Sequence, residues 1–133
     1  MKEEYVYKNH PKLFEYHIPQ KLNIGLMKKA IKYFEGEHDF CAFKASGTSS
    51  KSSVRIIYKA EVSQDGDRIY IDLTGNGFLY NMVRIIVGTL IRVGRGFYEP
   101  EKVKEILEAK DRKAAGVTAP AHGLMLVEIN YDV

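Results

Sequence analysis

The fold of this chain is decided by the stretch VRIIYKAEVSQDGDRIYIDLT, residues 54–74. Its first arm, residues 54–63, alternates between apolar and mainly polar side chains, as a half-buried strand does. The predicted inner face of this arm carries Val54, Ile56, Tyr58, Ala60 and Val62. The Asp65-Gly66 pair favours a tight turn. The return arm, residues 68–74, directs Ile69, Ile71 and Leu73 inward. We therefore predict an antiparallel hairpin with one buried face.

The segments before this hairpin predict a strand and a helix. Residues 4–8 alternate and carry two tyrosines, which is typical of a short strand. Residues 24–35 have an apolar stripe at helical spacing, with Asn23 in the N-cap position and Gly36 just past the end. This helix is therefore expected to pack its apolar stripe on the sheet.

The segments after the hairpin complete the pattern. Residues 78–93 are apolar around most of a helical circumference, which predicts a largely buried helix. Pro100 suits the first position of a further helix, and residues 124–131 alternate like a strand. The predicted order is β-α-β-β-α-α-β, an α+β class with the split β-α-β pattern of ferredoxin-like domains. The helices would cover one face of an antiparallel sheet, and the open face would carry Arg55, Lys59, Arg68, Tyr70 and Thr74.

Length and composition predict one soluble domain, residues 1–133. The apolar fraction is 45% and the charged fraction 28%, as in ordinary globular proteins. Cys41 has no partner for a disulfide, and no apolar run reaches the length of a membrane span. The four histidines do not show the spacing of metal ligands. We expect a cytoplasmic protein without a metal site or a membrane partner.

The positive charge of the chain is concentrated in two windows that contain no acidic residue. Residues 40–60 carry four basic side chains, and residues 73–98 carry three. Such windows are typical of surfaces that bind a polyanion. Clustering by chance, in loops and on a helix, is the alternative interpretation.

Arg84 is the most informative single residue, because it lies in an otherwise apolar predicted helix. A polar stripe at spacings of three and four joins it to Asn81, Gly88 and Arg92. Gly88 lets another group approach the helix. Arg84 is either an arginine whose stem covers apolar surface or a planar fork that holds a carboxylate or phosphate. Position alone leaves both interpretations open.

Four blocks of the chain resemble one family in the same order. They are EGEHDFCAF (35–43), SSVR (52–55), GNGFLYNMVRIIVGTLIRVG (75–94) and KDRKAAGVTAPAHGLMLVEINY (110–131). They resemble the C-terminal half of the bacterial tRNA pseudouridine synthase A family. The resemblance implies isomerisation of uridine to pseudouridine in the anticodon stem-loop of tRNA, by a homodimeric enzyme that needs no cofactor. The uridine would leave the base stack, and its glycosidic bond would break at an aspartate.

The resemblance also implies roles for individual residues. Arg84 matches the arginine that pairs with the catalytic aspartate, and Tyr5 matches the active-site tyrosine of a K-x-Y-x-Y strand. Gly123 and Leu124 match the strand start that closes over the uracil. Tyr80 and Asn81, close to the arginine, are assigned to substrate binding. The residues expected to bind RNA are Lys44, Lys51, Arg55, Arg92 and Arg95.

One feature of the family is absent from this sequence. The catalytic aspartate of the family lies in a Gly-Arg-Thr-Asp motif, and no aspartate here follows Arg-Thr. We therefore expect an N-terminal domain outside this chain to supply the nucleophile, so that this chain alone is inactive. Arg84 should then lack an internal carboxylate partner. Two alternatives stay open: a stand-alone RNA-binding module without catalysis, and a dimerisation or small-ligand domain.

Overall fold

The computed structural model describes residues 2–9, 22–45, 52–66, 68–79, 81–119 and 124–130, and of these it describes 2–9, 68 and 124–130 by their backbone only. The strands in this part are β1 (Lys2–Asn9), β2 (Gly36–Asp39), β3 (Val54–Asp65), β4 (Arg68–Gly75) and β5 (Leu124–Asn130). The helices are α1 (Ile24–Ile31), α2 (Met82–Gly94) and α3 (Lys102–Ala109), with short 3-10 helices η1 (Lys32–Phe34), η2 (Cys41–Phe43) and η3 (Arg112–Ala114).

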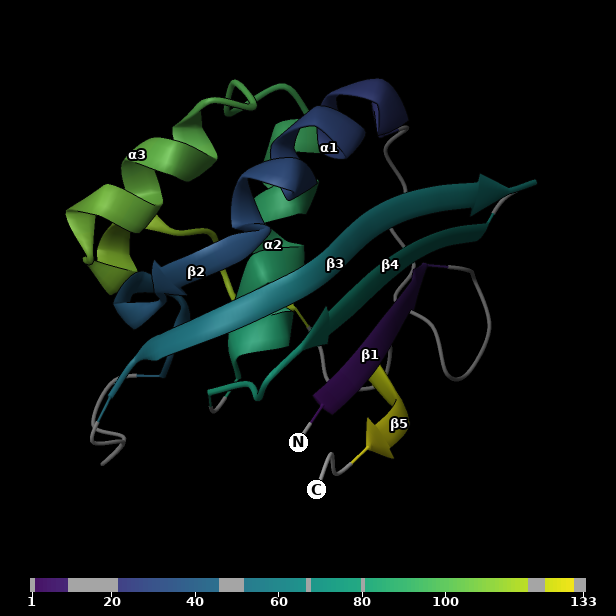
Figure 1. Ribbon diagram of the computed structural model, residues 1–133. Coiled ribbons are helices and arrows are strands. Elements are labelled where there is room, and N and C mark those ends of the chain that lie inside the picture. Colours follow the sequence, from purple (N-terminus) through teal and green to yellow (C-terminus); the bar gives the residue numbers. More distant parts are fainter. Residues whose placement is uncertain are drawn as a thin grey trace.

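The described strands form one antiparallel sheet in the order β2-β3-β4-β1-β5 (Figure 1). When β2 is left aside, β1 lies between β4 and β5, and the hairpin strands β3 and β4 are adjacent. This is the order expected when two β-α-β units interlock. The α+β class and the helices on one face of the sheet are therefore confirmed.

The β3–β4 hairpin forms as predicted, and Ile69, Ile71 and Leu73 are buried. The inner face predicted for the start of β3 is wrong, however. The register shifts between Ile57 and Lys59, which pair with Gly75 and Thr74, so Tyr58 is an extra residue in a β-bulge. A one-residue slip exchanges the two faces of a strand. Ile57 is therefore buried, while Val54 and Tyr58 are exposed.

Several predicted boundaries differ from the structure. The chain forms a strand, β2, that the sequence did not predict, because its residues GEHD become a strand only by pairing with β3. The first helix is shorter than residues 24–35, since its last turn is the 3-10 helix η1. Asn23 caps α1 as predicted, and its Oδ1 accepts from the backbone N–H of Leu26 at 3.1 Å. Pro100 precedes the N-cap residue Glu101 of α3 and is not its first helical residue.

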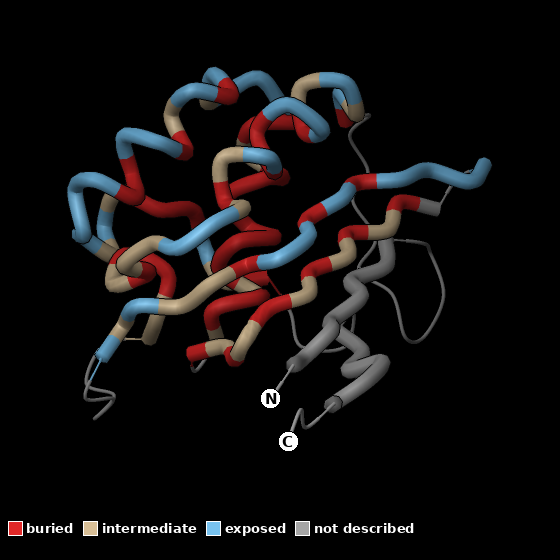
Figure 2. The backbone as a smooth tube through the Cα atoms, in the orientation of Figure 1, coloured by how far each residue is buried: buried red, intermediate tan, exposed pale blue. Residues whose placement is uncertain are grey.

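The core lies between the sheet and the helices (Figure 2). Helix α2 is buried along its whole length except at Arg84 and Arg92. On the opposite face of the sheet Lys59 is exposed and Tyr70 and Thr74 are half-buried, while the side chain of Arg68 is outside the described residues. The expected position of Arg55 on this face is wrong, because the bulge at Tyr58 puts Arg55 on the same face as the buried Ile57. None of the described helices has the length and apolarity that a membrane crossing requires. The fold thus presents two arginines from an otherwise buried helix.

Candidate active site

Helix α2 begins at Met82, four residues later than predicted, so Arg84 lies in its first turn. The preceding loop stays out of the helix because Asn76 pairs with β3. Its side-chain Oδ1 accepts from Ile56 N at 2.8 Å, and its backbone N donates to Ile56 O at 3.0 Å. Asn81 then adopts a left-handed conformation with φ 61°, which asparagine tolerates better than most residues. The loop and the helix therefore meet at a fixed corner beside Arg84.

Two hydrogen bonds hold the guanidinium of Arg84 in one orientation, and a third joins the backbones of Arg84 and Ala119. Its Nε donates to the carbonyl of Ala119 at 2.7 Å, and its Nη1 donates to Oδ1 of Asn81 at 3.0 Å. The backbone N of Ala119 donates in return to the carbonyl of Arg84 at 3.0 Å. Among the described residues no carboxylate forms an ion pair with Arg84. The guanidinium of Arg84 therefore belongs to a half-buried residue, has a fixed orientation and has no carboxylate partner among the described residues.

The segment that anchors Arg84, residues 116–119, lies directly against α2, and we call it the strap. A Cβ built on Gly88 would come within 1.6 Å of the carbonyl oxygen of Val117. A Cβ on Gly116 would come within 2.8 Å of the backbone of Thr89. Gly88 and Gly116 are thus the positions at which the two backbones touch. The sequence predicted an approaching group at Gly88, and the strap is that group.

Buried polar contacts lock the strap in place. The hydroxyl of Thr89, fully buried, donates to Ile85 O and accepts from Gly116 N, both at 2.9 Å. From η3, Arg112 donates through Nη1 to Gly116 O at 2.9 Å and through Nη2 to Thr118 Oγ1 at 3.1 Å. The strap is therefore held at Gly116 and Thr118 before it reaches Arg84. Sequence reasoning missed Thr89 and Arg112, although a threonine next to Gly88 in an apolar helix is a signal that could have been used.

The other predicted catalytic and substrate residues lie partly outside the described chain. Tyr5 lies in β1 and pairs in register with Leu73 and Leu126. Leu124 opens β5 on the neighbouring strand, opposite Tyr7. Gly123 and Tyr80 lie outside the described residues. The backbone thus brings the Tyr5 and Leu124 positions to adjacent strands, and the structure brings Asn81 into contact with Arg84.

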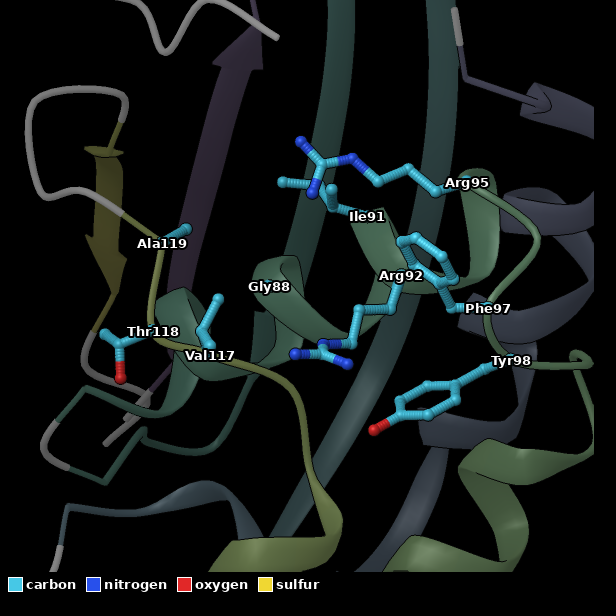
Figure 3. Close-up of a pocket in the computed structure, with 9 residues that line it drawn as sticks. All are labelled: Gly88, Ile91, Arg92, Arg95, Phe97, Tyr98, Val117, Thr118 and Ala119. Atoms are coloured by element: carbon cyan, nitrogen blue, oxygen red, sulfur yellow. The ribbon is translucent and has the colours of Figure 1, made fainter. Parts of the chain in front are cut away.

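The predicted RNA-binding residues fall into two groups. Arg55 is half-buried, and its Nη1 donates to the carbonyls of Ser52 and Val54 at 2.9 and 2.7 Å. Lys44 is half-buried after η2, and Lys51 lies outside the described residues. Arg92 and Arg95, by contrast, line a pocket of about 400 Å³ near the end of α2 (Figure 3). The remaining lining residues are Gly88, Ile91, Phe97, Tyr98, Val117, Thr118 and Ala119.

Among the described residues, no group of three or more His, Cys, Asp or Glu side chains could hold a metal ion. The half-buried Cys41 is a free thiol. Its backbone N–H donates to Oδ1 of Asp39 at 3.0 Å. The candidate site is therefore defined by Arg84, Asn81, the strap and the pocket beside it.

Comparison with known proteins identifies the family of this chain. Residues 30–132 match the family described as tRNA pseudouridine synthase, and the chain belongs to this family. It is 46% identical over 140 residues to the tRNA pseudouridine synthase A of Bacillus subtilis, an alignment that covers 99% of this chain and 57% of the relative. The enzymes of the same name from Anoxybacillus flavithermus and Thermoanaerobacter sp. are 50% and 53% identical, over 90% and 87% of this chain and 48% of each relative. The chain spans about half the length of the curated relatives it matches.

Proposed function

We propose that this chain is the C-terminal half of a tRNA pseudouridine synthase, which isomerises uridine to pseudouridine in the anticodon stem-loop of tRNA. An N-terminal domain, carrying the nucleophilic aspartate, completes the cleft. The observation that carries the proposal is Arg84: its fork is oriented by Ala119 and Asn81 and has no carboxylate partner among the described residues. The match to about half of each relative supports the division into two domains.

Arg84 is proposed to receive and orient the aspartate of the other domain. A guanidinium presents its N–H groups in a planar fork that matches a carboxylate. Within the described chain Arg84 uses Nε and Nη1 internally, which leaves Nη2 for an external acceptor. Because the fork is already fixed, the complex loses little further conformational entropy when the aspartate arrives. A paired carboxylate held in this way is set for attack on the flipped uridine.

The proposed reaction exchanges one glycosidic bond for another. The N1–C1′ bond of uridine breaks, the uracil rotates, and a C5–C1′ bond forms. The proton on C5 leaves and N1 gains a proton, so no oxidant, metal or organic cofactor is required. The base must be out of the stack for this rotation to occur.

The remaining site residues are proposed to enclose the uracil. Tyr5 and Leu124 belong to the adjacent strands β1 and β5, which suits a shared wall of the cleft. Gly123 would admit the base closely, and Tyr80 would contact it. Asn81 acts through Arg84, since its Oδ1 is bonded to Nη1. It is therefore a positioning residue rather than a direct substrate contact.

Binding of the tRNA is assigned to the basic residues of the two acid-free windows. Lys44, Lys51 and Arg55 would contact phosphates from one window, and Arg92 and Arg95 from the other. Phosphate contacts of this kind position the RNA without reading its sequence. The complete enzyme is proposed to be a cytoplasmic homodimer.

A chimeric enzyme tests this function. This chain would replace the corresponding half of the Bacillus subtilis relative, because the alignment of the two covers 99% of this chain. A tRNA transcript with tritium at C5 of uridine releases tritium to water only if the base is isomerised. We expect release from the chimera, and no release from the same chimera with Arg84→Ala. Folded chimeras that bind tRNA without releasing tritium would instead support an RNA-binding module without catalysis.

A further inference from the structure

The turn at the end of α2 brings two aromatic residues, Phe97 and Tyr98, close to the helix. Gly96 has φ +86°, and its N–H donates to Val93 O at 3.0 Å. The N–H of Phe97 donates to Arg92 O, also at 3.0 Å. This pair of bonds is a Schellman motif, which requires the left-handed residue that glycine supplies. The turn therefore places Phe97 and Tyr98 beside Arg92.

The two aromatic residues differ in what covers them. Arg92 lies over the Tyr98 ring, with its Cζ 5.6 Å from the ring centroid, and Lys102 Nζ lies 6.0 Å from the same centroid. Phe97 is 68% exposed, the largest exposure among the large apolar side chains described. Exposing a phenylalanine forgoes the stabilisation that its burial would provide. The Phe97 ring is therefore accessible to a ligand and lies beside Arg92 and Arg95.

The charges around Phe97 indicate what the ligand is. Arg92 and Arg95 line the pocket, and within the described part of the chain neither guanidinium pairs with a carboxylate (Figure 3). The hollow on the other side of Phe97 and Tyr98 carries four glutamates against two lysines. An anion is thus favoured in the pocket that the strap lines and repelled in the hollow that α3 lines. A ligand with both an anionic group and a flat ring matches the pocket that the strap lines.

From this geometry we propose that the pocket between the strap and the α2 end binds an unpaired nucleotide of RNA. The base stacks on Phe97, and Arg95 and Arg92 hold the flanking phosphates. Proteins that bind single strands combine stacking aromatics with a positive groove in this way. The partner, RNA, is taken from the proposed function. The stacking site itself is a separate claim.

The stacked nucleotide is distinct from the one that reacts. Arg95 follows Arg84 by 11 residues on α2 and its cap, which at 1.5 Å per residue separates them by about 16 Å along the axis. The strap joins the two places, because Ala119 both bonds Arg84 and lines the pocket. The pocket therefore holds a neighbouring unpaired nucleotide and fixes the strand relative to Arg84.

The test compares single-stranded and double-stranded RNA. Fluorescence anisotropy with the full chain would measure affinity for a labelled oligonucleotide, alone and paired to its complement. Phe97→Ala should weaken single-strand binding between about fivefold and about 150-fold, as expected for loss of one stacked base. It should leave duplex binding unchanged, and Phe97→Tyr, which keeps the ring, should retain single-strand affinity.

Tyr58→Ala is the matched control, because Tyr58 is a 54% exposed aromatic on β3, away from the pocket. It should change neither affinity. Equal effects of Phe97→Ala and Tyr58→Ala, or no effect of Phe97→Ala on the single strand, would overturn the proposal. So would a change of sedimentation mass in Phe97→Ala with RNA affinity intact, because the patch would then be an interface between copies. Tritium release plays no part in this test, so a chimera without turnover would leave its result standing.

Discussion

The two ends of α2 carry arginines that are held in opposite ways. At its start, Arg84 is fixed by Ala119 and Asn81 at 2.7 and 3.0 Å. At its end, Arg92 contacts the Tyr98 ring, and Arg95 is exposed at the pocket without a hydrogen-bonded partner for its guanidinium in the described residues. A fixed fork suits chemistry that depends on angle, whereas a free one suits phosphates whose positions vary. The start of α2 thus holds a guanidinium in a fixed orientation, whereas the end of α2 presents guanidinium groups that attract phosphates.

The largest expected effect is on turnover at the fixed end. In the chimeric enzyme, Arg84→Ala should cost about 3–4 kcal/mol of transition-state stabilisation, the amount lost with one preorganised donor. Arg84→Lys should be nearly as damaging, since lysine keeps the charge and loses the fork. Single-turnover tritium release beside thermal unfolding measures both quantities. If Arg84→Ala unfolded at a lower temperature while its folded fraction kept the full rate of tritium release, Arg84 would be a structural residue.

The next largest effect is on the contact between α2 and the strap. Gly88→Ala should destabilise the chain by about 3 kcal/mol, because the added Cβ would force the carbonyl of Val117 away. Gly25→Ala in α1 is the matched control, since its Cβ meets no atom closer than 3.4 Å and alanine favours a helix. Urea unfolding gives both free energies. If the two variants were equally stable, the close approach of the strap would be wrong.

A smaller effect should follow from the hydroxyl that holds the strap. Thr89→Val keeps the shape but leaves the N–H of Gly116 without its acceptor, at a cost of about 1–2 kcal/mol. Thr89→Ser keeps the hydroxyl and should lose less. The free energy of unfolding of each variant distinguishes them. A Thr89→Ser variant less stable than Thr89→Val would contradict the role assigned to the hydrogen bonds.

The smallest effect is on the salt dependence of RNA binding. The chain should bind RNA with a slope of about −2 to −4 in log K against log salt. Arg95→Ala should reduce the size of this slope by about one, because one phosphate contact is lost. Arg84→Ala should leave it unchanged, since that fork is engaged internally. Anisotropy titrations at several salt concentrations measure the slope of each variant. Identical slopes for Arg95→Ala and Arg84→Ala would show that the two ends of α2 do not differ in phosphate binding.

Local patterns predicted the elements whose causes are local. The Asp65-Gly66 turn, the Asn23 cap and the apolar length of α2 all follow from neighbouring residues, and each is present. The bulge at Tyr58 depends on pairing with β4. Alternation along β3 alone could not reveal it, because the register belongs to both strands.

The same division holds for the candidate site. Arg84 and Gly88 were recognisable as an isolated charge and a missing side chain in an apolar helix. The group that fills the space, the strap, comes from 27 residues later in the sequence, as the Gly116–Thr89 bond shows. Arg112 resembled any surface arginine until its bonds to Gly116 and Thr118 were visible. Long-range contacts of this kind leave no periodic signal in a single sequence.

The contrast between the two ends of α2 is tested most directly by the mobility of the arginine side chains, measured by nitrogen-15 relaxation of their Nε–H groups in the full chain. We expect an order parameter for Arg84 close to the value of about 0.85 for rigid backbone, and a value below about 0.6 for Arg95. The bond from Arg84 Nε to Ala119 O is the physical reason for the difference. An Arg84 as mobile as Arg95 would contradict the claim that α2 holds one arginine for orientation and leaves the other free for phosphate.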